Sequence, residues 1–199
     1  MAAAHARIAE LEEALHLANL TASQPQNRTG DRTEALVRAK ITELGLEATR
    51  PFPDYGVDLE VRRPGRETPV VRLQVKGRGA EQTNKKYRWF QIRTTSAQRK
   101  KAVAAGHDVT DTWRQKVALC DFFVLVALRL EECWVMPQAQ VLEIGEANRL
   151  VYGNRAGSLR GEVAELDLDI APEGELLTER YDAYRNAFHL IEAALAAQG

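Results

Sequence analysis

The chain has 199 residues, of which 45% are hydrophobic and 28% are charged, and its formal net charge is −1 at pH 7. This composition is that of a folded globular domain and excludes a disordered chain. The near-zero net charge excludes a polycation, so nucleic-acid binding would have to depend on local charge.

The two cysteines, Cys120 and Cys133, stand in apolar stretches and are expected to be buried, reduced thiols. The sequence has no CxxC or clustered Cys/His pattern, so a structural zinc site is not expected. The longest apolar run, residues 122–128, is too short to span a bilayer, and the N-terminus lacks the apolar core of a secretory signal. We therefore expect a soluble, cytoplasmic protein without a membrane partner.

The N-terminal segment is rich in Ala, Leu and Glu, and its apolar residues recur at helical spacing. Pro25, Asn27 and Gly30 then predict a linker. Residues 1–24 are accordingly predicted to form a helical extension, which either packs on the core or dimerises with a second copy. Residues 31–199 are predicted to form the main domain.

A second helix is predicted over residues 31–44, ending at Gly45. Asp31 and Glu34 have the Asp-x-x-Glu spacing of a capping box. Glu34 also lies three residues before Val37, so it shares the apolar side of the helix, where a carboxylate is costly unless another group pairs with it. Glu34 thus has two open roles, capping the helix or serving a site.

Two alternating segments follow, residues 57–62 and 70–76, and a turn-rich stretch separates them. Alternation with a period of two is typical of half-buried strands, so the pair is predicted to be a β-hairpin.

The rest of the chain predicts further strands and helices, with residues 149–170 left open. They are a strand at 87–94, helices at 96–105 and 110–119, a buried central strand at 121–130, a short strand at 133–136, a helix after Pro137, and a last helix through Tyr181, Tyr184, Phe188, Ile191 and Leu195. This order of elements predicts an α/β fold in which helices flank one mixed sheet.

The predicted hairpin brings four polar side chains to one face. With the turn centred near residues 66–67, Asp58 lies opposite Lys76 and Glu60 lies opposite Gln74. Cross-strand partners are about 5 Å apart at Cβ, so two carboxylates, an amide oxygen and an ammonium converge. Side chains alternate along a strand, so the apolar residues point to the other face: Val57, Leu59, Val61, Leu73 and Val75.

Phosphodiester hydrolysis needs such a set of groups. Hard oxygen ligands hold a divalent ion such as Mg²⁺ or Mn²⁺ and leave positions open for water and phosphate. Asp58, Gln74 and Glu60 are the candidate ligands, and Glu34 could add an oxygen or orient a bound water. Lys76 could orient the nucleophile or offset the developing negative charge.

This pattern resembles the PD-(D/E)xK nuclease superfamily, which implies a restriction-endonuclease-like fold. The matching stretches are Gly56-Val-Asp58-Leu-Glu60-Val and Leu73-Gln-Val-Lys76-Gly77, with Glu34 on the preceding helix. The resemblance covers about residues 31–130. It implies that Asp58 and Gln74 are metal ligands, Lys76 the catalytic lysine and Glu34 the helix carboxylate. Pro53-Asp54 spells the family's "PD" but precedes the strand, so Asp58 is preferred.

Gln74 departs from the family pattern, in which Asp or Glu is usual at this position, although some members, including certain homing endonucleases, have Gln. An amide oxygen can bind a cation but contributes no charge, and Glu60 is expected beside it to compensate. Otherwise the chain is a degenerate copy that binds without cutting. The plainer alternative is a solvated hairpin face on which Asp58 and Lys76 form a cross-strand ion pair.

Positive charge is concentrated between residues 76 and 101, where nine basic residues accompany one acid, Glu81. Such a local excess favours binding of a phosphate backbone. Tyr87, Trp89 and Phe90 interleave with it and either stack on bases or are buried in the sheet. Beyond Lys76, the residues predicted to bind nucleic acid are Arg78, Lys85, Lys86, Arg88, Arg93, Arg99, Lys100 and Lys101.

The sequence thus predicts a Mg²⁺- or Mn²⁺-dependent DNA endonuclease that hydrolyses phosphodiester bonds through metal-activated water. DNA is the expected partner, RNA is an open alternative, and a homodimer is a candidate assembly. Two other classes stay open. One is a catalytically degenerate nucleic-acid-binding protein of the same fold, and the other is a protein–protein adaptor that assembles through its terminal helices.

Overall fold

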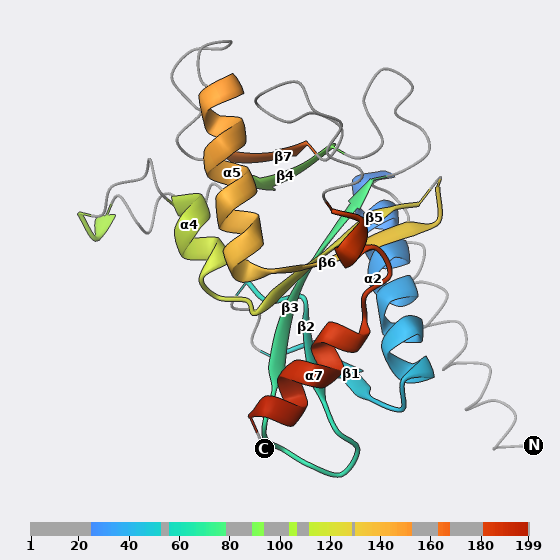
Figure 1. Ribbon diagram of the computed structural model, residues 1–199. Helices are drawn as coiled ribbons and strands as arrows, with labels where there is room; N and C mark the ends of the chain where they lie inside the picture. Colours follow the sequence, from blue (N-terminus) through green and yellow to red (C-terminus); the bar gives the residue numbers. More distant parts are fainter. Residues whose placement is uncertain are drawn as a thin grey trace, which may run out of the picture.

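Five strands form the central sheet of this protein, whose computed structural model is drawn in Figure 1. Their order across the sheet is β1, β2, β3, β5, β6. Strands β3 and β5 run parallel, and all other neighbours in the sheet are antiparallel. The strands are β1 (Glu47–Thr49), β2 (Leu59–Arg62), β3 (Val71–Arg78), β5 (Phe122–Ala127) and β6 (Glu132–Pro137).

The predicted hairpin, central strand and mixed α/β sheet are therefore confirmed. The structure describes residues 25–52, 56–78, 89–93, 104–106, 112–128, 130–152, 163–167 and 181–198. The predicted extension at residues 1–24, most of the predicted helix at 96–105, and Pro53-Asp54 lie outside these residues.

A second, two-stranded sheet corrects the prediction of a single sheet. The predicted strand at 87–94 is observed as β4 (Trp89–Arg93), but it pairs antiparallel with β7 (Val163–Asp167). Strand β7 lies in the stretch that the sequence left open, after helix α5 (Gln138–Tyr152). Partners far apart in the chain cannot be identified from the local pattern of either strand.

Helices cover both faces of the central sheet (Figure 1). One face packs against α2 (Pro25–Glu43) and α7 (His189–Ala197), and the other against α4 (Thr112–Val117) and α5. Along β5, Val124 joins the α2 side and Leu125 joins the α4–α5 side. Burial on both faces explains why β5 is apolar throughout.

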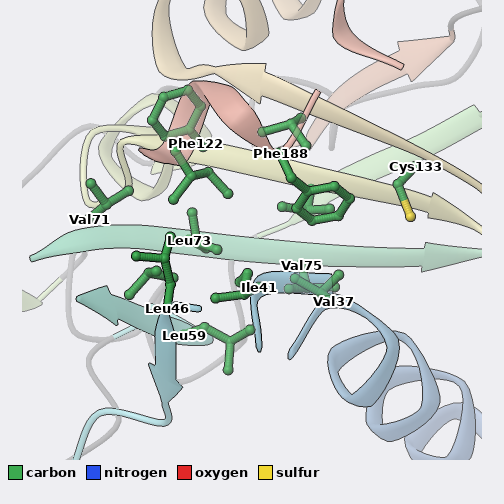
Figure 2. Packing of buried hydrophobic residues seen from close by; sticks show 14 of the residues in the cluster. Val37, Ile41, Leu46, Leu59, Val71, Leu73, Val75, Phe122, Cys133 and Phe188 are labelled. Carbon is green, nitrogen blue, oxygen red and sulfur yellow. The ribbon is translucent and has the colours of Figure 1, made fainter. Parts of the chain in front are cut away.

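The contact between α2 and β3 determines where the helix carboxylates lie. Val37 and Ile41 of α2 are fully buried, and they gather with Leu73 and Val75 of β3 (Figure 2). The helix ends as predicted, because Gly45 adopts a φ of +72° and its N–H donates to Thr42 O at 2.9 Å.

The predicted start of this helix is wrong. Helix α2 begins at Pro25, so the predicted linker residues from 25 to 30 are helical, and Asp31 and Glu34 lie inside the helix instead of forming a capping box. Proline is well tolerated in the first helical turn, where its missing N–H costs no hydrogen bond. Pro25 and Gly30 are therefore helical residues here, although both are also common in turns.

The predicted last helix is also corrected, because the chain breaks in its middle. A short 3-10 helix, η3 (Asp182–Tyr184), precedes α7, and Asn186 between them has a φ of +52°. The Asn186 N–H donates to Cys133 O of β6 at 2.7 Å. This contact lets Tyr181 pack on the α4–α5 side while Ile191 packs on the α2 side.

None of the helices in the described part of the chain is long and apolar enough to cross a membrane.

Candidate active site

Asp58 and Gln74 meet across the β2–β3 hairpin. The Gln74 amide nitrogen donates to Asp58 Oδ2, and the Val75 N–H donates to the same oxygen at 2.7 Å. The observed register pairs Leu59 with Leu73 and Glu60 with Arg72. The predicted register is therefore wrong by two residues: Asp58 takes the place beside Gln74 that was predicted for Glu60, and it is not opposite Lys76.

A shift of two residues preserves which side chains share a face, so the polar face survives the correction. Leu59, Val61 and Leu73 pack together as predicted. Val57 does not join them, because it is buried in the cluster on the opposite side of the sheet. Strand β2 begins only at Leu59, and Gly56 has a φ of +95°, so simple alternation does not extend back to Val57.

Gln74 is a polar residue whose side chain is almost completely buried. Thr33 and Gln74 are the two polar residues that are buried among those the structure describes. While the Gln74 nitrogen bonds to Asp58, its Oε1 has no hydrogen-bond partner in the part of the chain that the structure describes. A buried oxygen without a partner is costly, and a bound group that accepts its lone pairs would remove the cost.

Lys76 is partly buried two residues further along β3. Burial, helped by the positive charge of Lys116 on α4, lowers the pKa of Lys76 from 10.5 to about 8, and the charges of Asp58 and Glu34 limit the fall. In the described part of the chain no ion pair joins Lys76 to Asp58, so the alternative of a simple cross-strand ion pair is not borne out.

Glu34 reaches the same region from α2. Its side chain is 18% exposed, and Arg50, which follows β1, holds it: Arg50 Nε donates to Glu34 Oε2 at 2.8 Å, and Nη2 is 2.7 Å from the same oxygen. Burial raises the pKa of Glu34, Arg50 opposes the rise, and the charge of Asp58 adds to it. Glu34, Asp58, Gln74 and Lys76 are hereafter called the hairpin cluster.

A close approach of backbone and helix brings Glu34 to the hairpin. A Cβ at Gly77 would lie 2.7 Å from Thr33 Oγ1 and closer still to Thr33 Cγ2. The buried Thr33 hydroxyl donates to backbone oxygens of its own helix, 2.8 Å from Gly30 O and 3.0 Å from Thr29 O. Glycine at position 77 thus permits α2 to lie directly against β3, with Glu34 one residue beyond the contact.

The other predicted residues are placed as follows. Glu60 is half-buried on the polar side of β2, two cross-strand pairs away from Asp58 and Gln74. Arg78 ends β3, and the backbone of Arg93 ends β4. The remaining predicted nucleic-acid-binding residues lie outside the described residues: Lys85, Lys86, Arg88, Arg99, Lys100 and Lys101.

Two residues near the cluster were missed by the sequence analysis, Arg50 and Lys116. Glu34 gave the signal for Arg50, because a carboxylate on the apolar side of a helix needs a partner. Its identity depended on β1, a three-residue strand too short to show alternation. Lys116 shares α4 with the buried Trp113 and Val117, and only the tertiary packing of α4 brings it to Lys76.

The donor atoms of the cluster suit a hard divalent cation. Among the residues described, no three His, Cys, Asp or Glu side chains gather into a metal-binding group. Asp58 and Gln74 nevertheless bring a carboxylate and a side-chain amide into contact through the amide nitrogen, and the amide oxygen has no hydrogen-bond partner among the described residues. Glu34 adds a second negative charge nearby. Mg²⁺ and Mn²⁺ take such oxygen ligands and keep several waters of their own.

Three chains of solved structures are similar to this chain. No protein-family model and no curated protein matches this chain. A solved structure of a bacterial homing endonuclease, I-Ssp6803I, is similar with a TM-score of 0.47 and 19% sequence identity, covering 88% of this chain and 96% of that chain. The activity in that name belongs to the other protein, and a likeness of this size carries no inference about the activity of this one.

Proposed function

We propose that this chain is a DNA endonuclease of the PD-(D/E)xK type, with a restriction-endonuclease-like core, that hydrolyses phosphodiester bonds with the help of Mg²⁺ or Mn²⁺. The observation that carries the proposal is the buried Gln74 amide, whose nitrogen contacts Asp58 and whose oxygen has no partner among the described residues. A buried polar group in this state at a conjunction of charged side chains is typical of a ligand site.

Asp58 and Gln74 are the residues that would hold the ion, by a carboxylate and an amide oxygen. When bound, such an ion would make water more acidic and offset negative charge on the phosphate. Asp58 is held in place by the Val75 N–H at 2.7 Å, so its orientation does not depend on the ion. Glu60 is a further candidate ligand from the neighbouring pair of the hairpin.

Lys76 would act next to the phosphate. Its ammonium is buried and lies near the positive charge of Lys116. Two neighbouring positive charges favour the binding of an anion. We infer that Lys76 binds a non-bridging phosphate oxygen and stabilises the charge that develops there. Glu34 would accept a hydrogen bond from the attacking water and orient it.

The basic stretch from residue 76 to 101 is the proposed DNA-binding surface, because it continues directly from β3 and Lys76. Reversing Lys85, Lys86 and Arg88 to Glu should weaken DNA binding and reduce its dependence on salt concentration. Fluorescence anisotropy with labelled duplex DNA at several salt concentrations measures both, and an unchanged affinity would remove this surface from the proposal.

The proposed activity is tested by cleavage of supercoiled plasmid, linear duplex, single-stranded and branched DNA with Mg²⁺, with Mn²⁺ or with EDTA. Wild type is compared with Asp58→Ala, and Asp182→Asn is the matched control, since Asp182 is an exposed carboxylate of η3 that pairs with Arg185. Cutting that requires the ion, disappears in Asp58→Ala and persists in Asp182→Asn supports the proposal. Absence of cutting by wild type on every substrate contradicts it.

A second candidate function follows from the neutral side chain at position 74. With Gln in place of an acid, and no group of three acidic or His/Cys side chains among the described residues, the ion would be held weakly. A protein of this kind that binds DNA without cutting it is distinguished by unchanged DNA affinity in Asp58→Ala and by no cleavage in wild type.

A further inference from the structure

Arg50 has contacts that no step of the proposed reaction uses. It follows the edge strand β1, and its guanidinium bridges two carboxylates of α2, Asp31 and Glu34. The contact with Asp31 is exposed, with side chains 56% and 55% exposed, whereas Glu34 is 18% exposed. Arg50 therefore joins the solvent side of α2 to the side that faces the hairpin cluster.

The contact is selective for one oxygen of Glu34. Both Arg50 Nε, at 2.8 Å, and Nη2, at 2.7 Å, contact Oε2, so Oε1 receives neither of them. Two N–H donors that converge on one carboxylate oxygen hold that oxygen in position. The Asp31 contact, 3.1 Å from Nη2, fixes the guanidinium in turn.

We propose that Arg50 is a positioning residue that holds Glu34 by one oxygen and so keeps the other oxygen directed to the hairpin cluster. This inference rests on the proposed function. Glu34 is close enough to Asp58 and Lys76 for their charges to influence one another, so its orientation matters to what the cluster can bind. A carboxylate that orients water contributes to the rate only while its own geometry is fixed.

The first measurement is of the rate of cleavage. Arg50→Gln should lower kcat by about 10- to 100-fold with KM for DNA nearly unchanged, the usual range for a residue that orients another. Arg50→Lys should recover part of the rate, since an ammonium supplies the charge but not two parallel N–H groups. In a Glu34→Gln background, Arg50→Gln should cause no further loss.

The matched control is Asp31→Asn, which removes the exposed negative charge that pairs with the Arg50 guanidinium but leaves the contact between Arg50 and Glu34. Its cleavage rate should be within a few-fold of that of wild type. A raised KM with an unchanged kcat in Arg50→Gln would instead assign Arg50 to a DNA phosphate and overturn the inference. An unchanged rate in Arg50→Gln would overturn it as well.

A second measurement separates this inference from the proposed function. In ion-free protein labelled with carbon-13 at Glu carboxyls, nuclear relaxation reports the order of Glu34, whose signal is assigned by its loss in Glu34→Gln. Glu34 should be ordered in wild type and Asp31→Asn and mobile in Arg50→Gln. If wild type cuts no DNA, the proposed function fails while this result still decides the role of Arg50, and an equally ordered Glu34 in Arg50→Gln overturns it.

Discussion

Asp58 and Gln74 contact each other through the amide nitrogen of Gln74, which leaves the amide oxygen buried and without a partner in the described structure. This arrangement suits the ion-free protein, because an N–H next to a carboxylate is favourable and two oxygens side by side are not. A cation would reverse that preference, since it attracts both oxygens. Under the proposed function, binding of an ion would therefore be linked to the orientation of the Gln74 amide.

Replacement of Gln74 by Glu tests this link. The variant places a second carboxylate against Asp58, so in EDTA it should lose about 1–3 kcal/mol of unfolding free energy through charge repulsion and burial. Mg²⁺ or Mn²⁺ should then raise its melting temperature more than that of wild type. Gln140→Glu is the control, because Gln140 also donates to a carboxylate, Glu143, at 3.0 Å. Equal ion effects in both variants would contradict a site at Gln74.

Lys76→Met should increase stability at neutral pH and abolish cleavage. Folding lowers the pKa of Lys76 from 10.5 to about 8, so the unfolded chain binds more protons between these values and the folded state is penalised at lower pH. The penalty is at most about 3 kcal/mol and is fully present below pH 8. The advantage of Lys76→Met should therefore shrink as the pH rises from 8 to 10.5.

Urea unfolding of both proteins from pH 6 to 10.5 measures this difference. Lys40→Met serves as the control, because Lys40 is 46% exposed and pairs with Glu43, and its replacement should change the unfolding free energy by less than about 1 kcal/mol. A Lys76→Met variant that is less stable than wild type at pH 7 would show that burial of the Lys76 ammonium does not destabilise the folded protein.

Gly77→Ala should destabilise the protein and slow cleavage, because the added Cβ would displace Thr33 and with it α2. Overpacking of this kind costs about 1–3 kcal/mol. Removing the obstacle in the Thr33→Ala/Gly77→Ala double variant should restore part of both losses. Gly30→Ala, in α2, is the control, since nothing lies within 4 Å of its added Cβ. This variant should leave the free energy of unfolding unchanged or increase it. Thermal unfolding and cleavage rates are compared.

Glu60→Gln and Asp58→Asn distinguish the two hairpin carboxylates. The observed register places Asp58 at Gln74 and Glu60 at Arg72. We therefore expect cleavage to be lost in Asp58→Asn and to remain within about ten-fold in Glu60→Gln, since a ligand in direct contact contributes more than a neighbour two cross-strand pairs away. Equal loss in both would return Glu60 to the set of ligands.

The sequence predicted the hairpin, the central strand and the polar face, because each depends on alternation that is visible in a few residues. The register depended on the turn, whose exact shape is not encoded in that alternation, so Glu60 was placed where Asp58 lies. The face itself was unaffected, because an error of two residues leaves every side chain on its side.

What the sequence could not predict involved partners distant in the chain. The carboxylate of Glu34 was recognised as one in need of a partner, but Arg50 becomes that partner only when β1 pairs with β2. The break at Asn186 likewise depends on its contact with Cys133, which no helical periodicity reveals. A regular apolar spacing continued across the break, and the spacing alone predicted one helix.

Helix α7 completes the hydrophobic cluster on the α2-facing side of the sheet, so this cluster can form fully only after α7 has been synthesised. Phe188, Ile191 and Leu195 complete that hydrophobic cluster, yet they leave the ribosome after every strand of the sheet. Until then Val71, Leu73 and Val124 lack part of their covering, and a growing chain presents them to solvent. Transiently exposed apolar strands of this kind are prone to aggregate, so the synthesis of α7 ends the period in which the growing chain is at risk.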